Sequence, residues 1–268
     1  MSGREDDRRL LQDAVRAAGM LALVYFRGEL RHWEKAKGDP VSEADHAVND
    51  LLRETLAGAR PAYGWLSEES QDAPARLDAG RVWVVDPIDG TRAFIDGKPE
   101  FTVAVALVED GRPVLAIVFN PATDEFFEAA AGEGARLNGA PIRVTGHPGL
   151  GGARLISGKR MFERAGWADP PEGASFFSIN SLAYRISLVA AGRYDAVVSL
   201  GVKSEWDVAA ADLVLSEAGG RITTARGEPY AYNKSEPEVR AVVAAGPALH
   251  DELLRFLATV PRPPGARW

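Results

Sequence analysis

Hydrophobic residues recur with a helical period at the start of the chain. Over residues 6–27, apolar side chains stand three or four positions apart and leave a charged face, which predicts an amphipathic helix. A second helix is predicted from Ser42, because Ser42-Glu43-Ala44-Asp45 fits an N-terminal capping pattern and apolar residues then continue one face. Residues 82–85, Val-Trp-Val-Val, form a short apolar run that predicts a buried strand.

The period changes to two after Phe101, and later to an alternation of strands and helices. Residues 101–109, 112–120 and 124–131 predict an antiparallel meander, with Asp110-Gly111 as its first turn. Beyond a glycine-rich stretch at 146–152, we expect strands at 153–156, 194–199 and 239–245, and helices at 181–191, 207–218 and from 247. We therefore predict an α+β domain over residues 1–150, with an antiparallel sheet, and an α/β domain over residues 151–268, with a smaller mixed sheet.

Composition and charge exclude several classes of protein. The chain has 268 residues, 31 basic against 38 acidic, and no cysteine. The absence of cysteine excludes a disulfide scaffold, a cysteine-ligated zinc or iron–sulfur site, and a cysteine nucleophile. The net charge of −7 disfavours nucleic acid and anionic membranes as partners. No stretch has the pattern of an export signal or a spanning helix, so we expect a cytoplasmic protein.

The densest candidate chemistry lies between residues 68 and 100, where eight acidic residues stand against four basic ones. Within it, Asp86-Pro87-Ile88-Asp89-Gly90-Thr91 sets two carboxylates three residues apart. Such carboxylates repel each other unless a cation neutralises them, and carboxylate and carbonyl oxygens suit Mg²⁺. If Thr91 begins a helix, the amides of Gly90 and Thr91 add an anion site. The alternative is an ordinary turn built from Asp, Pro and Gly.

Two further stretches favour the metal over the turn. Glu68 and Glu69 follow the apolar pair Trp65-Leu66, and Trp206-Asp207 begins a helix of small residues. An aspartate in a first helical turn also has a simpler explanation, the helix dipole. Haloacid-dehalogenase-type phosphatases share the letters Asp-Gly-Thr, but the spacing here is Asp-x-x-Asp and not Asp-x-Asp, which disfavours that class. An EF-hand is disfavoured because its alternating ligands are missing.

Taken together, four stretches resemble the inositol monophosphatase superfamily of Mg²⁺-dependent, lithium-sensitive phosphomonoesterases. They occur in the order of the family and extend from the first helix to about residue 250; they are Asp39 to Asp45, Ser67 to Ser70, Asp86 to Thr91 and Glu205 to Gly220. The resemblance implies a layered αβαβα sandwich. It also implies direct hydrolysis of a small phosphorylated metabolite by a metal-activated water, without a covalent intermediate.

The resemblance also assigns roles to individual residues. The implied ligands of two or three Mg²⁺ ions are Glu68, Asp86, Asp89, Asp207 and the carbonyl of Ile88. Asp45 and Thr91 are implied to orient the attacking water, with help from Glu68. Contacts to phosphate or substrate are implied for Ile88, Asp89, Gly90, Thr91, Lys203 and Asp207. Asp45 has an alternative role as a helix cap, and we expect that one carboxylate cannot fully serve both.

The fold does not choose among the phosphates on which the family acts. Arg92-Ala93-Phe94 stands where inositol-specific members tend to have Thr-Asn-Phe, and Leu200 stands where they place a glutamate. Both departures, with the stretch Lys203 to Asp207, look more like the bisphosphate nucleotidase branch. We therefore predict a 3′(2′),5′-bisphosphate nucleotidase that converts adenosine 3′,5′-bisphosphate to AMP. The alternative is an inositol-1-phosphatase or a broader sugar-phosphate or histidinol-phosphate phosphatase.

A second substrate phosphate needs a cation away from the metals. The candidates in the second half of the chain are Lys159, Arg160, Arg185 and Lys203, each of which has solvated surface as its simpler interpretation. Trp206 is a candidate to stack on a base, although core packing is the favoured interpretation. Homodimers are common among relatives, so a second copy is an expected partner. A non-catalytic binding protein is disfavoured because the implied metal ligands are all present.

Overall fold

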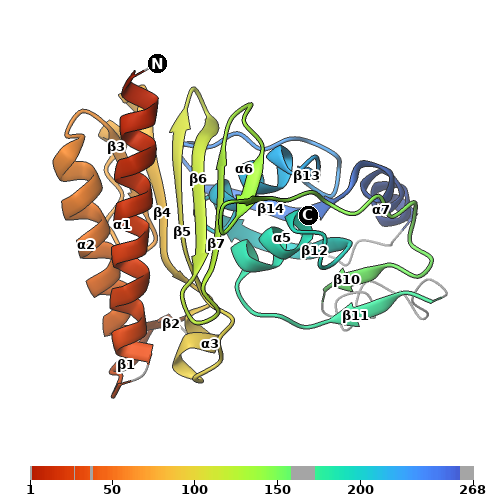
Figure 1. Ribbon diagram of the computed structural model, residues 1–268, viewed down its shortest axis with the longest axis horizontal. Helices are drawn as coiled ribbons and strands as arrows, with labels where there is room; N and C mark the ends of the chain where they lie inside the picture. The colour runs from red at the N-terminus through yellow and green to blue at the C-terminus, as the bar shows by residue number, and fades with distance from the viewer. Residues whose placement is uncertain (1, 27, 37–38, 158–172, 260–268) are drawn as a thin grey trace.

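The chain forms five layers in the order helices, sheet, helices, sheet, helix (Figure 1). The computed structural model describes residues 2–26, 28–36, 39–157 and 173–259. The outer helix layer holds α1 (Ser2–Phe26) and α2 (Glu43–Ala59), and the central one holds α5 (Leu182–Ala190) and α6 (Ala209–Glu217). Helix α7 (Pro247–Thr259) covers the far side. The αβαβα sandwich that the resemblance implies is confirmed.

The larger sheet has seven strands and comes entirely from the first half of the chain. Its order along the sheet is β3 (Gly64–Ser67), β4 (Arg81–Asp89), β5 (Thr102–Glu109), β6 (Arg112–Asn120), β7 (Glu125–Ala130), β8 (Ala135–Leu137) and β9 (Ala140–Pro141). Only β3 and β4 are parallel; the other pairs are antiparallel, as the meander predicts. Strand β4 is longer than the predicted 82–85, because after a bulge Asp89 pairs with Thr102.

The smaller sheet is mixed, as predicted, and comes from the second half. Its order is β11 (Ser175–Phe177), β10 (Arg154–Ile156), β12 (Ala196–Ser204), β14 (Glu238–Ala245) and β13 (Arg221–Thr223). The pairs of β10 with its two neighbours are parallel, and the other two pairs are antiparallel. Strand β12 differs from the predicted 194–199: it starts later and, beyond an irregularity after Ser199, continues to pair with β14 as far as Ser204.

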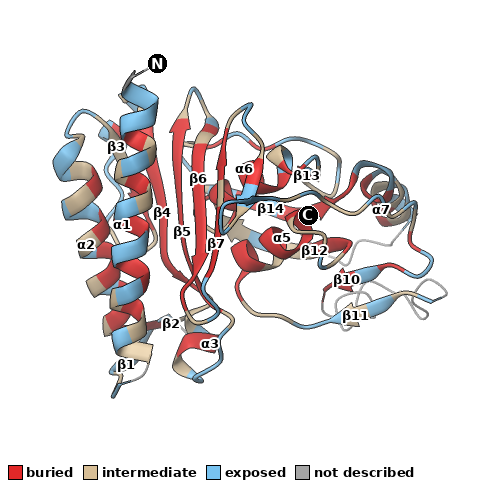
Figure 2. Ribbon diagram, in the orientation of Figure 1, coloured by how far each residue is buried: buried red, intermediate tan, exposed pale blue. Residues whose placement is uncertain are grey.

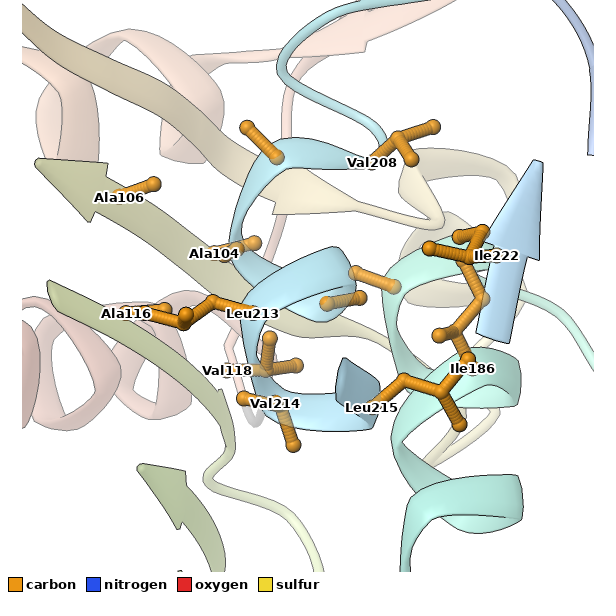
Figure 3. Packing of buried hydrophobic residues seen from close by; sticks show 14 of the residues in the cluster. Ala104, Ala106, Ala116, Val118, Ile186, Val208, Leu213, Val214, Leu215 and Ile222 are labelled. Carbon is orange, nitrogen blue, oxygen red and sulfur yellow. The ribbon is translucent and has the colours of Figure 1, made fainter. Parts of the chain in front are cut away.

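Alternation along the central strands explains why both faces of the large sheet are buried (Figure 2). Trp83 and Val85 pack with the helices α1 and α2, whereas Val82 and Val84 pack with the central helices. Figure 3 shows Leu213 of α6 extending toward Ala116 of the sheet. Because these helices follow residue 150 yet bury against the first sheet, one core joins both halves. The domain boundary near residue 150 stays a prediction.

Three short elements complete the part of the fold that surrounds the site. The hairpin of β1 (His32–Ala36) and β2 (Asp39–Ser42) leads directly into α2, and the sequence did not predict it. A 3₁₀ helix, η1 (Pro74–Asp78), connects β3 to β4, and α3 (Thr91–Ile95) follows β4. Among the described helices, none combines the length and the apolar character needed to cross a bilayer.

The central helix layer gives a stability prediction. Val214 is fully buried in α6, and Val24 on α1 is 69% exposed. We expect Val214→Ala to lower the free energy of unfolding by about 2 kcal/mol more than Val24→Ala, since only the former loses buried methyl groups and leaves a cavity. Both substitutions replace valine by alanine within a helix, so the difference in helix propensity cancels. Urea unfolding of both variants measures this, and equal losses would contradict the buried position of α6.

Candidate metal centre

Two neighbouring aspartates of β4 meet a third aspartate from the second half of the chain. Asp86, Asp89 and Asp207 each place a carboxylate oxygen within 4.8 Å of the oxygens of the other two. Asp86 and Asp89 lie in the last part of β4, and Asp207 lies between the end of β12 and the start of α6. Helix α6 begins at Ala209, not at the predicted residue 207, because the backbone of Val208 (φ −124°, ψ −37°) departs from helical angles.

Asp86 indicates most directly that a cation belongs in this cluster. The residue is 1% exposed, and no described residue donates a hydrogen bond to either carboxylate oxygen. Burial raises the pKa of Asp86 well above its usual value, and the nearby carboxylates of Glu68, Asp89 and Asp207 raise it further. A buried carboxylate without donors is costly unless a cation or a proton compensates it. A set of carboxylate oxygens fits a hard divalent cation such as Mg²⁺.

Asp89 is held in place by the beginning of α5. Its Oδ2 accepts hydrogen bonds from the Ser181 hydroxyl at 2.7 Å and from the Ala183 amide at 2.6 Å. These bonds lower the pKa of Asp89, but burial raises it more, and the net direction is upward. Gly90 allows the close approach: its φ is +95°, and a Cβ there would lie 2.9 Å from the carbonyl oxygen of Glu100. No other residue fits this turn without displacing its neighbours.

Asp45 is in contact with Thr91, and the same carboxylate also caps α2; its role in catalysis stays a prediction. Oδ2 of Asp45 accepts both the amide (2.8 Å) and the hydroxyl (2.6 Å) of Ser42 and so caps α2. Oδ1 lies 3.1 Å from the Thr91 hydroxyl, which also lies 3.0 Å from the carbonyl oxygen of Ile88. The two oxygens of one carboxylate therefore divide the two contacts. Since the hydroxyl has one proton, it donates to one acceptor at a time.

Glu68 lies at the rim of the cluster and not among the three closest carboxylates. Its Oε1 accepts a hydrogen bond from Lys35 Nζ at 3.0 Å, and the same ammonium reaches Glu69 at 2.5 Å. Burial raises the pKa of Glu68 to about 7, against the opposing effect of Lys35. Burial lowers the pKa of Lys35, but the two glutamates raise it by more. Lys35 thus places one positive charge beside the carboxylates.

The pocket at the rim contains part of the predicted substrate site. It is lined by Lys35, Glu68, Val202, Lys203, Ser204, Trp206, Asp207 and Glu238. Trp206 is half-buried and packs against the central core, as the favoured interpretation had it, and it also lines this pocket. Lys159 and Arg160 lie outside the described residues.

Arg185 on α5 lies near Asp89 and Glu100 and is not among the residues that line the rim pocket. Burial lowers the pKa of its guanidinium, against the raising effect of Asp89 and Glu100. Its Nε is buried and has no acceptor among the described residues.

Sequence reasoning missed two residues that shape the site, Lys35 and Ser181. Lys35 lies in a hairpin that the sequence did not predict, and its partners are more than thirty positions away. Ser181 stands at the start of a predicted helix, which was a usable signal, but its bond to Asp89 spans 92 positions. A capping residue can be found from local pattern, whereas its distant acceptor cannot.

Removal of one carboxylate tests the metal centre without any substrate. In Mg²⁺-free buffer, we expect Asp86→Asn to be at least as stable as the parent, because the amide removes a buried charge beside other carboxylates. Saturating Mg²⁺ should raise the Tm of the parent and leave that of the variant unchanged; occupancy at 100-fold above Kd corresponds to about 2.7 kcal/mol.

The control for this experiment is Asp212→Asn on α6. The Asp212 carboxylate is also buried, but it is bonded to Tyr232 and Ser216 and lies outside the cluster. This variant should keep the response of the parent to Mg²⁺. An equal Tm increase in Asp86→Asn and the parent would argue against a metal at these aspartates.

The raised pKa values also predict how the Tm of the metal-free protein, measured in EDTA, depends on pH. Because the pKa of Glu68 is higher in the folded state, the stability that its proton adds is fully present below the unfolded pKa and is lost as the pH rises through about 7. We expect the Tm in EDTA to fall between pH 5 and pH 8, and to fall less in Asp86→Asn. Mg²⁺ should restore it at pH 8. A Tm that rises with pH in EDTA would contradict this account.

Comparison with known proteins gives the family of the chain. The sequence model of the inositol monophosphatase family matches residues 5–261. An inositol-1-monophosphatase of Rhizobium meliloti is 37% identical over 233 residues, which cover 81% of this chain and 85% of that protein. A histidinol-phosphatase of Mycobacterium tuberculosis is 36% identical, with coverage of 94% and 98%. The crystal structure of the extragenic suppressor protein suhB from Bartonella henselae superposes with a TM-score of 0.80, at 28% identity and coverage of 94% and 98%. The chain belongs to the inositol monophosphatase family and is a phosphomonoester hydrolase.

Proposed function

We propose that this protein hydrolyses the phosphate monoester of a small polyol or amino alcohol, with inositol 1-phosphate and histidinol phosphate as representative substrates. The observation that carries the proposal is the unpartnered Asp86 beside Asp89 and Asp207, next to the contact between Thr91 and Asp45. The names of the Rhizobium and Mycobacterium relatives supply the two substrates.

Asp86, Asp89 and Asp207 would hold the cation, with Glu68 and the carbonyl of Ile88 at the edge of the site. When bound, Mg²⁺ supplies positive charge to the phosphate and acidifies a coordinated water. Two or three ions remain the expectation from the resemblance. The chain itself holds these oxygens in position before substrate arrives, so that little reorganisation is needed during the reaction.

Asp45 and Thr91 would orient the attacking water and receive its proton. The Thr91 hydroxyl can accept a hydrogen bond from the water while it donates to Oδ1 of Asp45. Burial raises the pKa of Asp45 against the lowering effect of its hydrogen bonds from Ser42, so this carboxylate is a better base than an exposed one. The amides in the first turn of α3, which begins at Thr91, are available to the phosphate oxygens.

The rim pocket would receive the alcohol part of the substrate. Glu238 and Ser204 offer hydrogen-bonding groups to hydroxyls, and the carboxylate of Glu238 also suits an ammonium group such as that of histidinol. Lys203 contributes a positive charge on the same wall, and Trp206 contributes an aromatic surface. This mixture of polar groups favours a small, highly substituted alcohol over an apolar one.

A second candidate function is that of a bisphosphate nucleotidase, because Lys203 lines the pocket beside Asp207 and Arg185 lies near Asp89. Either cation could pair with a second phosphate. None of the three relatives described above is named a nucleotidase, and for that reason the small monophosphate is preferred.

Phosphate release from a substrate panel separates the two candidates. The panel contains inositol 1-phosphate, histidinol phosphate, fructose 1,6-bisphosphate and adenosine 3′,5′-bisphosphate, each with Mg²⁺. We expect kcat/KM to be highest for inositol 1-phosphate or histidinol phosphate. A tenfold preference for adenosine 3′,5′-bisphosphate, about 1.4 kcal/mol of transition-state discrimination, would reverse the choice.

The variant Lys203→Met gives an independent check on the second phosphate. With a monophosphate as substrate, we expect kcat/KM to change by less than about threefold, because its one phosphate would be bound by the cation at the aspartates and not by Lys203. On a bisphosphate that uses Lys203, KM should rise by tenfold or more. The matched control is Lys98→Met, because Lys98 is paired with Asp96 and does not line the pocket.

A further inference from the structure

Glu205 is a fully buried carboxylate that points away from the metal cluster although it stands two residues before Asp207. It is 0% exposed, and its two oxygens accept the backbone amides of Asn233 at 2.6 Å and Lys234 at 3.1 Å. Its own carbonyl accepts the amides of Val208 and Ala209 on either side of the start of α6. The turn that carries Asp207 is therefore tied to the loop at residues 233–234.

Arg76 holds the same loop from the other half of the chain. This residue of η1 is 3% exposed, and its guanidinium donates to Oδ1 of Asn233 at 2.6 Å and to the carbonyl of Lys234 at 2.8 Å. Asn233 returns a bond from Nδ2 to the carbonyl of Arg76 at 3.2 Å. Asp72 accepts further donors in a bidentate pair at 2.6 and 2.9 Å. Such planar guanidinium contacts, with four of the five N–H donors bonded, fix position as well as charge.

The backbone of Arg76 in turn packs on the strand that leads to Glu68. A Cβ on Gly64, in β3, would lie 2.9 Å from the Cβ of Arg76 and 3.1 Å from its Cα. Strand β3 ends at Ser67, and Glu68 follows directly. A continuous path of contacts thus joins Glu68, through β3, Arg76, Asn233 and Glu205, to the turn of Asp207.

Electrostatic repulsion acts to separate the two ends of this path. Glu68 and Asp207 line one pocket and repel each other, since each carboxylate is negative. They come from opposite halves of the chain, so no local element fixes their distance. The contacts through Arg76, Asn233 and Glu205 connect the two ends and can resist that separation.

We propose that Arg76, Asn233 and Glu205 are positioning residues that set the distance between Glu68 and Asp207, and thereby the affinity of the site for its divalent cation. This inference rests on the proposed function only in requiring a metal at the carboxylates. Outer groups that orient metal ligands typically contribute ten- to a hundredfold in affinity.

The variant Asn233→Gly removes the two hydrogen bonds that the Asn233 side chain makes with Arg76 and leaves the bond from Arg76 to the Lys234 carbonyl, so it weakens the link with little disturbance of the backbone. Asn233 has a φ of +62°, which glycine adopts without strain, and its amide to Glu205 is retained. We expect Mg²⁺ alone to bind the full-length variant about tenfold more weakly than the parent in isothermal titration calorimetry. Arg76→Lys, which keeps the charge and loses the planar fork, should weaken Mg²⁺ to a similar extent, and the double variant should lose little more than either single one.

Asn138→Gly is the matched control. Asn138 also has a positive φ (+49°), and its side chain also makes two hydrogen bonds, here both to backbone, at Phe126 and Asp124, in the turn after β8. We expect it to lose comparable stability and to keep the Mg²⁺ affinity of the parent. Affinity within twofold of the parent in Asn233→Gly and Arg76→Lys, or an equal loss in Asn138→Gly, would overturn the positioning role. Absence of Mg²⁺ binding by the parent would instead overturn the proposed function itself.

Discussion

Asp86, Asp89 and Asp207 bring three carboxylates close together, two of them buried, and their mutual repulsion is the constraint on which the arrangement of the site depends. Like charges at this separation stay together only when protons, hydrogen bonds or a cation compensate them. Asp86 has no hydrogen-bond donor among the described residues, so the protein itself leaves its compensation to a ligand. Charge that is uncompensated in the folded chain is the source of affinity for a divalent cation.

Helix beginnings supply part of the compensation that side chains do not. Asp45 lies in the first turn of α2, Asp89 accepts an amide from the first turn of α5, and Asp207 stands two residues before α6. The N-terminal end of a helix carries partial positive charge and unpaired amides. These three helix beginnings lie close together because Asp45 contacts Thr91, shortly after β4, and because Asp207 clusters with Asp86 and Asp89 of β4. Compensation by backbone leaves the carboxylate oxygens partly free to bind a metal.

The acidic balance of the chain does not conflict with an anionic substrate. Eight of the 38 acidic residues fall between residues 68 and 100, where several face the proposed metal. Lys35 already pairs with two of them, and Lys203 lies on the wall of the same pocket. With cations bound, the local field would be less negative than the average over the molecule, and a phosphate responds to the local field.

The sequence by itself determined most of the longer helices and strands and indicated the chemical type of the site. Period two from residue 101 predicts the meander because alternate side chains of β5 and β6 face two different helix layers, and Asp86 to Thr91 indicates oxygen ligands because the spacing and residue types are local. The limits of β4 and β12 were not predictable, since bulges and distant partners extend them. Only the tertiary structure decided that Glu68 stands at the rim with Lys35, that Asp45 serves both α2 and Thr91, and that Arg76 meets Asn233 across 157 positions. Each of these depends on which surfaces bury against each other, and that is a property of the whole packed chain and not of any one segment.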